Sequence, residues 1–399
     1  MAEAIRRRKL ETLKDFYGLM AETRVVRLGA VADALDGRPA DAGALGSLRN
    51  ALACLEDVPV LAGKRVLSLD AERSIELDMD YEIDETRKDL FYLEEGEPAF
   101  LDFLADLHPG FDEQVAAGRE LLAGLDLGCL VTDRDGTINN YCARYLTSIQ
   151  SVYNAVFLTR FARRHVRRPV VLTSAPLDGL VRISVAPEGV LYYAASKGRE
   201  CLDLEGRVRR LAIEPDKQRA LDGLNERLSA LVARPEYEKF SLIGSGLQFK
   251  FGQSTVARQD IGGSVPEAES LAFLKVLERA VAEADPAGRL FRIEDTGLDV
   301  EIILTVETED SGLKDFDKGD GVRFLNTELD LGMSGGAHLV CGDTGSDVPM
   351  LETAMEMSTQ TRAIFVTRKE DLARRVTGIT DNALIVPEPD MLVAVMGTL

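Results

Sequence analysis

From Leu127 to the end of the chain, short apolar runs alternate with amphipathic segments, and few folds accommodate this alternation. The apolar runs include GCLVTD, RPVVLTSAP, GAHLVCGD, AIFVT and NALIVP. Between them lie segments with helical spacing, such as SIQSVYNAVFLTRFARRH (with Ser148 as a candidate N-cap), VPMLETAMEM and DLARRV. Short buried strands separated by helices indicate α/β architecture with a doubly wound, Rossmann-like parallel sheet. Such sheets bind their ligands at the carboxyl ends of the strands.

The first part of the chain, residues 1–126, has a different pattern. Segments such as KLETLKDFYGLMAETRVVRLGAVADAL and GFDEQVAAGRELLAGL repeat apolar residues at spacings of three and four. Strand-like runs are scarce there. We therefore expect an all-helical N-terminal domain of roughly five or six helices.

A third pattern occupies residues 211–311. Two helical segments, DKQRALDGLNERLSALVAR and PEAESLAFLKVLERAVAEA, alternate with strand-like SLIGSGLQFKFGQ, LFRIEDTG and DVEIILTVE. This pattern predicts a small open-faced α/β domain inserted in the larger one. The expected order is thus a helical domain (1–126), the first part of the core (127–210), an inserted domain (211–311) and the second part of the core (312–399).

Composition narrows the class of protein. The 399 residues carry a formal charge of −20, which makes nucleic acid and anionic membranes poor partners. No apolar run is long enough to span a membrane, and the N-terminus has no apolar segment typical of a signal peptide. Five scattered cysteines without a CxxC pair favour a reducing, cytoplasmic setting, and three histidines make histidine-based metal sites improbable.

Polar side chains stand at four predicted strand ends or helix starts in the core. They are Asp133 and Asp135, Thr173 and Ser174, Lys318, and Asp343 and Asp347. Parallel strands bring these positions to one edge of the sheet. Isolated pairs of this kind are ordinary turns, strand ends or helix-start acids, and Lys318 lies beside Asp317 and Asp320 as in a solvated charge cluster. Their order along the chain favours a shared function.

Together these groups supply what phosphoryl transfer from a monoester requires. One carboxylate can attack phosphorus, and a second can protonate the leaving group and then activate water. Mg2+ prefers carboxylate oxygens and offsets the repulsion between two anionic reactants. A hydroxyl and an ammonium group can hold the remaining phosphate oxygens.

The four motifs DRDGT, TS, DKG and GDTGSD resemble, in this order, those of the haloacid dehalogenase (HAD) superfamily of phosphotransferases. Forty positions separate Asp133 from Thr173, and 145 separate Thr173 from Lys318. That spacing resembles the branch whose α/β cap (a C2-type cap) is inserted after the second motif. The resemblance covers about residues 127–399 and leaves the helical N-terminus outside.

Within this branch, VLYYAASKGRECLDLEGRV is similar to a segment of trehalose-6-phosphate phosphatases, although Lys197-Gly198 stands where those enzymes usually have His-Gly. The GDTGSD motif is nearer to sucrose-phosphate phosphatases. The resemblance therefore implies a phosphatase for trehalose 6-phosphate. Sucrose phosphate, mannosyl-3-phosphoglycerate or a hexose phosphate stay open as substrates, as does a non-catalytic scaffold that uses the helical N-terminus for self-association or a protein partner.

The resemblance also implies a role for each motif residue. Asp133 would be the nucleophile and Asp135 the general acid and base. Thr173, Ser174 and Lys318 would grip phosphate. The Mg2+ ligands would be Asp133, the backbone carbonyl of Asp135, and Asp343, supported by Asp347. For the sugar, the candidate contacts are Lys197, Lys250, Arg292 and Glu294, with Gln253, Arg258 and Asp295 as further polar residues of the inserted domain.

Overall fold

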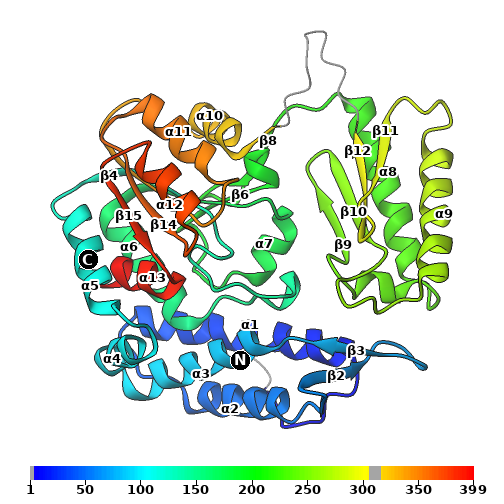
Figure 1. Ribbon diagram of the computed structural model, residues 1–399, viewed down its shortest axis with the longest axis horizontal. Helices are drawn as coiled ribbons and strands as arrows, with labels where there is room; N and C mark the ends of the chain where they lie inside the picture. The colour runs from blue at the N-terminus through cyan, green and yellow to red at the C-terminus, as the bar shows by residue number, and fades with distance from the viewer. Residues whose placement is uncertain (1–3, 305–315) are drawn as a thin grey trace.

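The protein is described here from a computed structural model, which covers residues 4–304 and 316–399. Its core is an eight-stranded sheet of order β15-β14-β13-β4-β5-β6-β7-β8 (Figure 1). The strands are β4 (Leu127–Thr132), β5 (Val166–Leu172), β6 (Tyr192–Ala195), β7 (Glu200–Leu202), β8 (Val208–Arg210), β13 (Ala337–Gly342), β14 (Arg362–Val366) and β15 (Ala383–Val386). Neighbouring strands from β15 to β6 are parallel, whereas the pairs β6–β7 and β7–β8 are antiparallel. The predicted doubly wound sheet is confirmed.

Helices cover both faces of this sheet, which is why its central strands are apolar throughout. The core helices are α6 (Val152–His165), α7 (Leu177–Ile183), α10 (Lys318–Glu328), α11 (Val348–Met357), α12 (Glu370–Thr377) and α13 (Pro389–Thr398). Leu130 and Leu339 point into the cluster that contains α6 and α13. Val131 and Val340, one position along each strand, point into the cluster of α10, α11 and α12, as the two-residue period of a strand requires.

The order in which successive strands are added to the sheet reverses between β4 and β13. From β4 the chain continues to β5 and β6 on one side, whereas β13 leads to β14 and β15 on the other. The loops after β4 and β13 therefore lead away to opposite sides from the carboxyl ends of these two strands. Open α/β sheets bind ligands at such a switch point. This is where the first and fourth motifs lie.

The N-terminal domain is a helical bundle, as expected, seen below the core sheet in Figure 1. Its helices are α1 (Leu13–Leu35), α2 (Ala42–Glu56), α3 (Asp80–Glu95), α4 (Glu97–Leu107) and α5 (Phe111–Leu122). A capping box between Thr12 and Asp15 begins α1, and Asp41 caps α2. The expectation that every element here is helical is wrong for one segment. Three short antiparallel strands separate α2 from α3: β1 (Val60–Leu61), β2 (Lys64–Ser68) and β3 (Ser74–Leu77).

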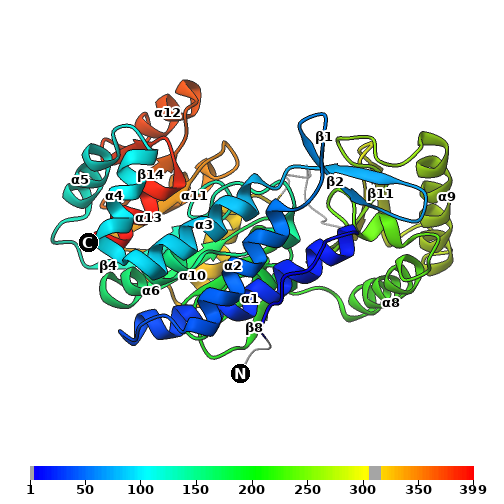
Figure 2. The same ribbon diagram turned by 90° about the horizontal axis from the view of Figure 1, so that it is seen from below.

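These strands escaped prediction because they are short and their alternation is weak. In β3 only Ile75 and Leu77 are buried, and β1 is two residues long and exposed. Isolated segments of this length carry too little periodicity to be distinguished from a loop. The small sheet connects the N-terminal domain to the inserted unit, because Arg73 in its β2–β3 loop forms an ion pair of 2.5 Å with Glu269. Figure 2 shows β2 extending toward that unit.

The inserted unit is an antiparallel sheet of order β11-β12-β10-β9 with two helices on one face (Figure 1). Its elements are α8 (Pro215–Val232), β9 (Leu247–Lys250), β10 (Gln253–Ala257), α9 (Glu267–Ala284), β11 (Phe291–Asp295) and β12 (Asp299–Leu304). Val300, Ile302 and Leu304 are buried, while the residues between them on β12 are partly exposed. Among the described residues, no helix of this unit covers the second face of its sheet. The predicted boundary at 311 and 312 lies outside the described residues, and the other domain limits stay predictions.

Within residues 4–304 and 316–399, no helix combines the length and apolar character needed to cross a membrane.

Candidate active site

The predicted motif residues follow strands of the core sheet or begin the helices α10 and α11. Asp133 directly follows β4, and its backbone N–H donates to the carbonyl of Cys341 on β13 at 3.0 Å. Lys318 is the first residue of α10, and Asp347 precedes α11. Asp343 follows β13, and Thr173 follows β5. Strands and helix starts, not flexible loop tips, therefore position these groups.

Lys318 joins two of the acids at the bottom of the site. Its Nζ lies 2.6 Å from Asp133 Oδ1 and 2.5 Å from Asp347 Oδ1. All three side chains are buried. Burial by itself lowers the pKa of Lys318, but the carboxylates of Asp133 and Asp347 outweigh it and raise the pKa. The lysine is therefore a fixed cation.

Asp347, which binds this lysine, is itself held by backbone donors. Its Oδ2 accepts hydrogen bonds from the backbone N–H of Asp343 at 3.1 Å and of Thr344 at 2.9 Å. Burial favours a higher pKa for Asp347, yet Lys318 and the Thr344 donors lower it. Asp347 thus stays ionised, and its oxygens are largely occupied by donors.

Asp133 and Asp343 have fewer donors than they have oxygens. The hydroxyl of Thr137 lies 3.4 Å from Asp133 Oδ2 and 3.2 Å from Asp343 Oδ1, and its single hydrogen serves one of them at a time. Burial raises the pKa of Asp133 to about 6, against the pull of Lys318. Burial, together with the Asp133 and Asp347 carboxylates, raises the pKa of Asp343 to about 7. Repulsion between these acids is only partly compensated.

A divalent cation fits this cluster. Oxygen atoms of Asp133, Asp343 and Asp347 lie within 4.8 Å of one another, and hard oxygen ligands suit Mg2+. The backbone at Gly136 packs directly against the Asp343 carboxylate. A side chain is excluded there, because the φ of 84° is left-handed and a Cβ would collide with that carboxylate. Mg2+ itself, and the metal role of the Asp135 carbonyl, stay predictions.

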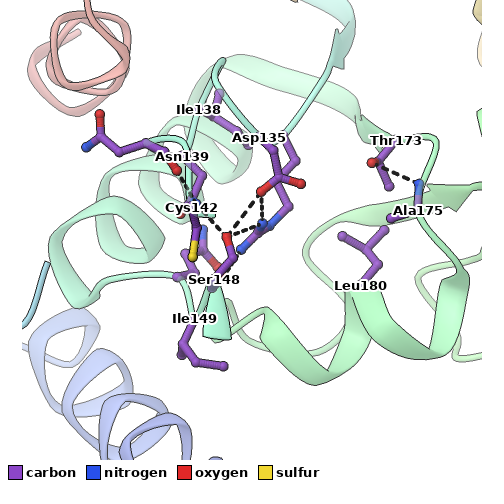
Figure 3. A network of polar contacts seen from close by, with 12 residues as sticks. Asp135, Ile138, Asn139, Cys142, Ser148, Ile149, Thr173, Ala175 and Leu180 are labelled. Carbon is purple, nitrogen blue, oxygen red and sulfur yellow. Dashed lines mark hydrogen bonds and ion pairs between the residues drawn. The ribbon is translucent and has the colours of Figure 1, made fainter. Parts of the chain in front are cut away.

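The side chain of Asp135 is held by residues outside the acid cluster. Its Oδ1 pairs with the guanidinium of Arg134 and accepts from the hydroxyl of Ser148 at 3.2 Å (Figure 3). About 29% of the side chain is exposed. It lines a cavity of about 360 Å³ between the core and the inserted unit. The two acids of the first motif thus occupy different environments, one inside the charge cluster and one at the cavity wall.

Several residues that line this cavity carried no signal in the sequence. They include Tyr141 and Tyr145 from the core and Gln248, Asp260 and Asp299 from the inserted unit. The inserted-unit residues come from loops and strand ends scattered over the unit, so neither spacing nor motif groups them. Only the packing of the two units brings them opposite Asp135.

The second motif contributes a buried hydroxyl and an exposed one. Thr173 is buried, its Oγ1 accepts from the N–H of Ala175 at 3.2 Å, and its carbonyl accepts from the N–H of Lys197 at 2.9 Å. Ser174 is exposed. Figure 3 shows Thr173 on a separate loop from Asp135. The phosphate-binding role of both residues stays a prediction.

Lys197 lies on a tight turn at the meeting point of the core and the inserted unit. Its φ is 62°, and the following Gly198 packs so closely on Gly321 that a Cβ at Gly198 would lie 2.7 Å from the Gly321 Cα. One residue earlier, the hydroxyl of Ser196 accepts from the N–H of Phe251 at 2.9 Å. This bond links the turn to the β9–β10 hairpin.

Strand register places the sugar candidates of the inserted unit on one face of its sheet. Lys250 pairs with Gln253, Gln253 with Ile303, and Ile303 with Arg292, so these residues share a face. It is the face opposite the buried Ile302. Burial lowers the pKa of Lys250, and Lys197 nearby contributes to this decrease.

The charged candidates on β11 each have an ion-pair partner. Arg292 and Glu294 form an exposed ion pair of 2.8 Å. Arg258 is buried and bonds Asp295 at 2.7 Å, as well as Ser270. Arg258 and Asp295 therefore have a structural task in joining β10 to β11 and α9.

An eight-stranded α/β core with carboxylates at its switch point, a helical bundle before it and an inserted α/β unit define the class: a HAD-type protein. Comparison with known families specifies it further. The family model "Trehalose-6-phosphate phosphatase, C-terminal" matches residues 130–392, and the model "Trehalose-6-phosphate phosphatase N-terminal helical bundle domain" matches residues 12–107. The chain belongs to the trehalose-6-phosphate phosphatase family.

Its relatives include two kinds of protein. The Caenorhabditis elegans alpha,alpha-trehalose-phosphate synthase [UDP-forming] 2 is 32% identical over an alignment of 420 residues, which covers 99% of this chain and 34% of the relative. The chain thus spans about a third of that relative. The Caenorhabditis briggsae trehalose-phosphatase is 31% identical over 299 residues, with 71% of this chain and 68% of the relative covered. Among solved structures, the Aspergillus fumigatus trehalose-6-phosphate phosphatase aligns with a TM-score of 0.37 and 15% identity, over 71% of this chain and 96% of that one.

Proposed function

We propose that the protein is a phosphoric monoester hydrolase that removes phosphate from trehalose 6-phosphate and requires Mg2+. The observation that carries the proposal is the division of the two acids of DRDGT. Asp133 lies beside Lys318 in an acid cluster short of positive charge, and Asp135 lies at the wall of a cavity. Family membership and the trehalose-phosphatase relatives support the choice of substrate.

The proposed reaction has two steps. An oxygen of Asp133 attacks phosphorus while the bond from phosphorus to the sugar oxygen breaks, and the carboxyl group of Asp135 donates its proton to that oxygen. Asp135, now ionised, then takes a proton from a water molecule that attacks the phosphorus. The bond between phosphorus and Asp133 breaks, and inorganic phosphate leaves. Water's second proton stays on the phosphate.

The surrounding residues stabilise charge during both steps. Lys318 favours the ionised form of Asp133 and can contact a phosphate oxygen, and Thr173 and Ser174 would bind others. When bound, Mg2+ would be held by Asp133, Asp343 and the carbonyl of Asp135, with Asp347 in support, and it would neutralise repulsion between nucleophile and phosphate. The inserted unit would act as a cap that excludes water. We place Lys197, Lys250, Arg292 and Glu294 around the sugar.

Phosphate release from a panel of phosphosugars, with Mg2+ or with a chelator, tests this proposal. Trehalose 6-phosphate should show the highest kcat/KM, and activity should vanish with the chelator and return on addition of Mg2+. The variant Asp133→Asn serves as the inactive control. A higher kcat/KM for sucrose phosphate, mannosyl-3-phosphoglycerate or a hexose phosphate would overturn the substrate, and Lys197 at the usual histidine position motivates their inclusion. No release from any ester would favour the scaffold instead.

Two further proposals concern the setting of the enzyme. The cysteines are buried with free thiols, which supports a reducing, cytoplasmic location. A protein partner or self-association through the N-terminal helices stays a prediction, as does the lack of a nucleic-acid or membrane partner.

A further inference from the structure

The N-terminal domain reaches the loop that carries the proposed general acid. Tyr81 is in the first turn of α3 and is buried against the core. Its hydroxyl lies 3.0 Å from Asn139 Oδ1 and 2.8 Å from the carbonyl of Ile149. Both acceptors belong to the segment between the first motif and α6. A side chain of the helical domain therefore contacts the loop that follows Asp135.

Asn139 closes that loop on itself. Its carbonyl accepts from the N–H of Gly136 at 2.8 Å, and its own N–H donates to the carbonyl of Arg134 at 2.9 Å. Its side-chain Nδ2 donates to Ser148 Oγ at 3.1 Å.

The single hydrogen of the Tyr81 hydroxyl is shared between Asn139 Oδ1 and the Ile149 carbonyl. Asn139 Nδ2 also donates to the carbonyl of Asn140 at 3.0 Å. Both contacts fit an Asn139 amide whose NH2 group is directed toward Ser148. Tyr81 and the Asn140 carbonyl thus hold this amide with its NH2 group toward the serine.

The orientation of the Asn139 amide in turn sets the direction in which the Ser148 hydroxyl donates to Asp135. A hydroxyl has one hydrogen to donate and two lone pairs that accept. The lone pairs of Ser148 Oγ face Asn139 Nδ2 at 3.1 Å and Arg134 Nη1 at 3.0 Å. Its hydrogen is then directed at Asp135 Oδ1, 3.2 Å away. Figure 3 shows Asn139, Ser148 and Asp135 side by side in this network.

We propose that Tyr81 of the helical domain is a positioning residue for the general acid, acting through Asn139 and Ser148. Ser148 and Arg134 occupy Oδ1 of Asp135, so Oδ2 is the oxygen that we assign to the proton transfer. This inference rests on the proposed function, because it assigns Tyr81 a task in the protonation of the leaving group. It also gives the helical domain a part in catalysis in addition to its part in stability.

The test exploits the fact that an acidic leaving group needs no proton. The variant Tyr81→Phe removes one buried hydroxyl and keeps the ring. kcat/KM, which reports the steps up to departure of the leaving group, is measured for trehalose 6-phosphate and for 4-nitrophenyl phosphate. Full general acid catalysis contributes ~100-fold or more, so a misplaced acid should lower kcat/KM for the sugar ester by ~10-fold and for the aryl ester by less than ~2-fold.

Tyr153→Phe is the matched control. The hydroxyl of Tyr153 is also buried at the contact between the helical domain and the core, but it donates to Asp390 at 2.6 Å and has no bond to the Asp135 network. This variant should change kcat/KM for both esters by the same factor. Should Tyr81→Phe fold poorly, Ser148→Ala tests the same relay from its last member and should show the same selective loss.

Equal losses on both esters for Tyr81→Phe and Ser148→Ala, or no loss on either, would overturn the positioning role and leave the proposed function intact. If the unaltered chain hydrolyses neither ester, the proposed function fails and this inference fails with it.

Discussion

Two buried clusters of charged residues in this protein contain similar residue types. The pKa values of Asp133 and Asp343 are raised in one cluster, and the pKa of the central acid is lowered in the other. The site cluster consists of Asp133, Asp343, Asp347 and Lys318 at the strand ends. The seam cluster lies where the helical domain meets the core. It is centred on Asp390 at the start of α13, which pairs with Lys88 of α3 at 2.7 Å.

In the seam cluster every oxygen of the central acid has a donor. Lys88 and His108 both lie 2.7 Å from Asp390 Oδ2, and Tyr153 and Asn140 donate to Oδ1 at 2.6 and 2.8 Å. Lys88 and His108 lower the pKa of Asp390 far below its usual value, against the effect of burial. A buried charge that is fully paired and hydrogen-bonded is tolerated in a protein interior.

The site cluster has three carboxylates for one lysine, and the pKa values of Asp133 and Asp343 are raised to about 6 and 7. The difference teaches that residue type does not distinguish a structural ion cluster from a functional one. What distinguishes them is whether the charges are compensated within the protein. An uncompensated cluster is where a cation or a charged substrate is expected.

The largest effect is expected from Asp133→Asn. Loss of the nucleophile should lower kcat by ~10⁴-fold or more, while the midpoint of denaturant unfolding of the cation-free protein should not fall, because the substitution also removes a repulsive charge. Activity assays and urea unfolding on the same preparation check both parts. A large loss of stability would mean that the site cluster is structural, as the seam cluster is.

The second effect concerns the seam. Asp390→Asn leaves Lys88 paired with the buried Glu85 at 2.8 Å. The expected cost is therefore that of the weakened hydrogen bonds to the Asp390 carboxylate, about 1.5–3 kcal/mol. The free energy of unfolding, measured in urea, should fall by that amount, while kcat of the folded enzyme at low temperature stays within ~2-fold of the unaltered chain. Asp381→Asn, at an exposed position, is the control. An unchanged midpoint would contradict the contrast between the clusters.

A third prediction separates the clusters by pH. The pKa of Asp343 is raised to about 7 in the folded protein, against about 3.9 in an unfolded chain. The stability associated with its protonated form is therefore present below pH 4 and is lost as the pH rises through 7. In cation-free protein, Asp343→Asn should raise Tm relative to the unaltered chain at pH 8 and not at pH 4.

Thermal unfolding across this pH range, with a chelator present, measures the difference. Asp390→Asn provides the opposite case, because the lowered pKa of Asp390 makes its ionised form stabilising. Its penalty should be present at pH 8 and should diminish in acid. Parallel pH profiles for the two variants would show that the clusters do not differ in the way described.

The smallest effect on stability is expected at an exposed ion pair, which serves as a reference for the two buried clusters. Arg292 and Glu294 are about half exposed, and such pairs contribute roughly 0.2–1 kcal/mol. Arg292→Ala should thus leave the unfolding midpoint nearly unchanged. If Arg292 contacts the sugar, KM for the phosphosugar should rise with kcat unaltered. Arg227→Ala is the control and should leave KM unchanged, because Arg227 of α8 forms a similarly exposed pair with Glu283 of α9.

Local pattern was sufficient for most of the core. Runs such as GCLVTD and GAHLVCGD are short and apolar because both faces of their strands are buried, and that pattern is local. The motif acids could be located for the same reason, since each directly follows such a run. The strands β1 to β3 were missed because two to five weakly alternating residues do not differ in pattern from a loop.

Ser148 illustrates what local pattern cannot give. Its position before an amphipathic segment suggested a helix cap, but α6 begins at Val152 after Ser151, and Ser148 instead bonds Asp135. Its role depends on Asn139 and on Tyr81, which is 58 residues from Asn139 in the chain. Such a contact leaves no periodicity in the sequence.

The sequence by itself determined the parallel core sheet, the edge at which its acids gather and the order of its motifs, because strand burial and strand-end position are properties of neighbouring residues. The tertiary structure alone decided which acid cluster is compensated, which face of the inserted sheet is open and which helix of the N-terminal domain supports Asp135. These depend on distances of a few ångströms between residues far apart in the chain, and electrostatic and hydrogen-bond energies change steeply over such distances.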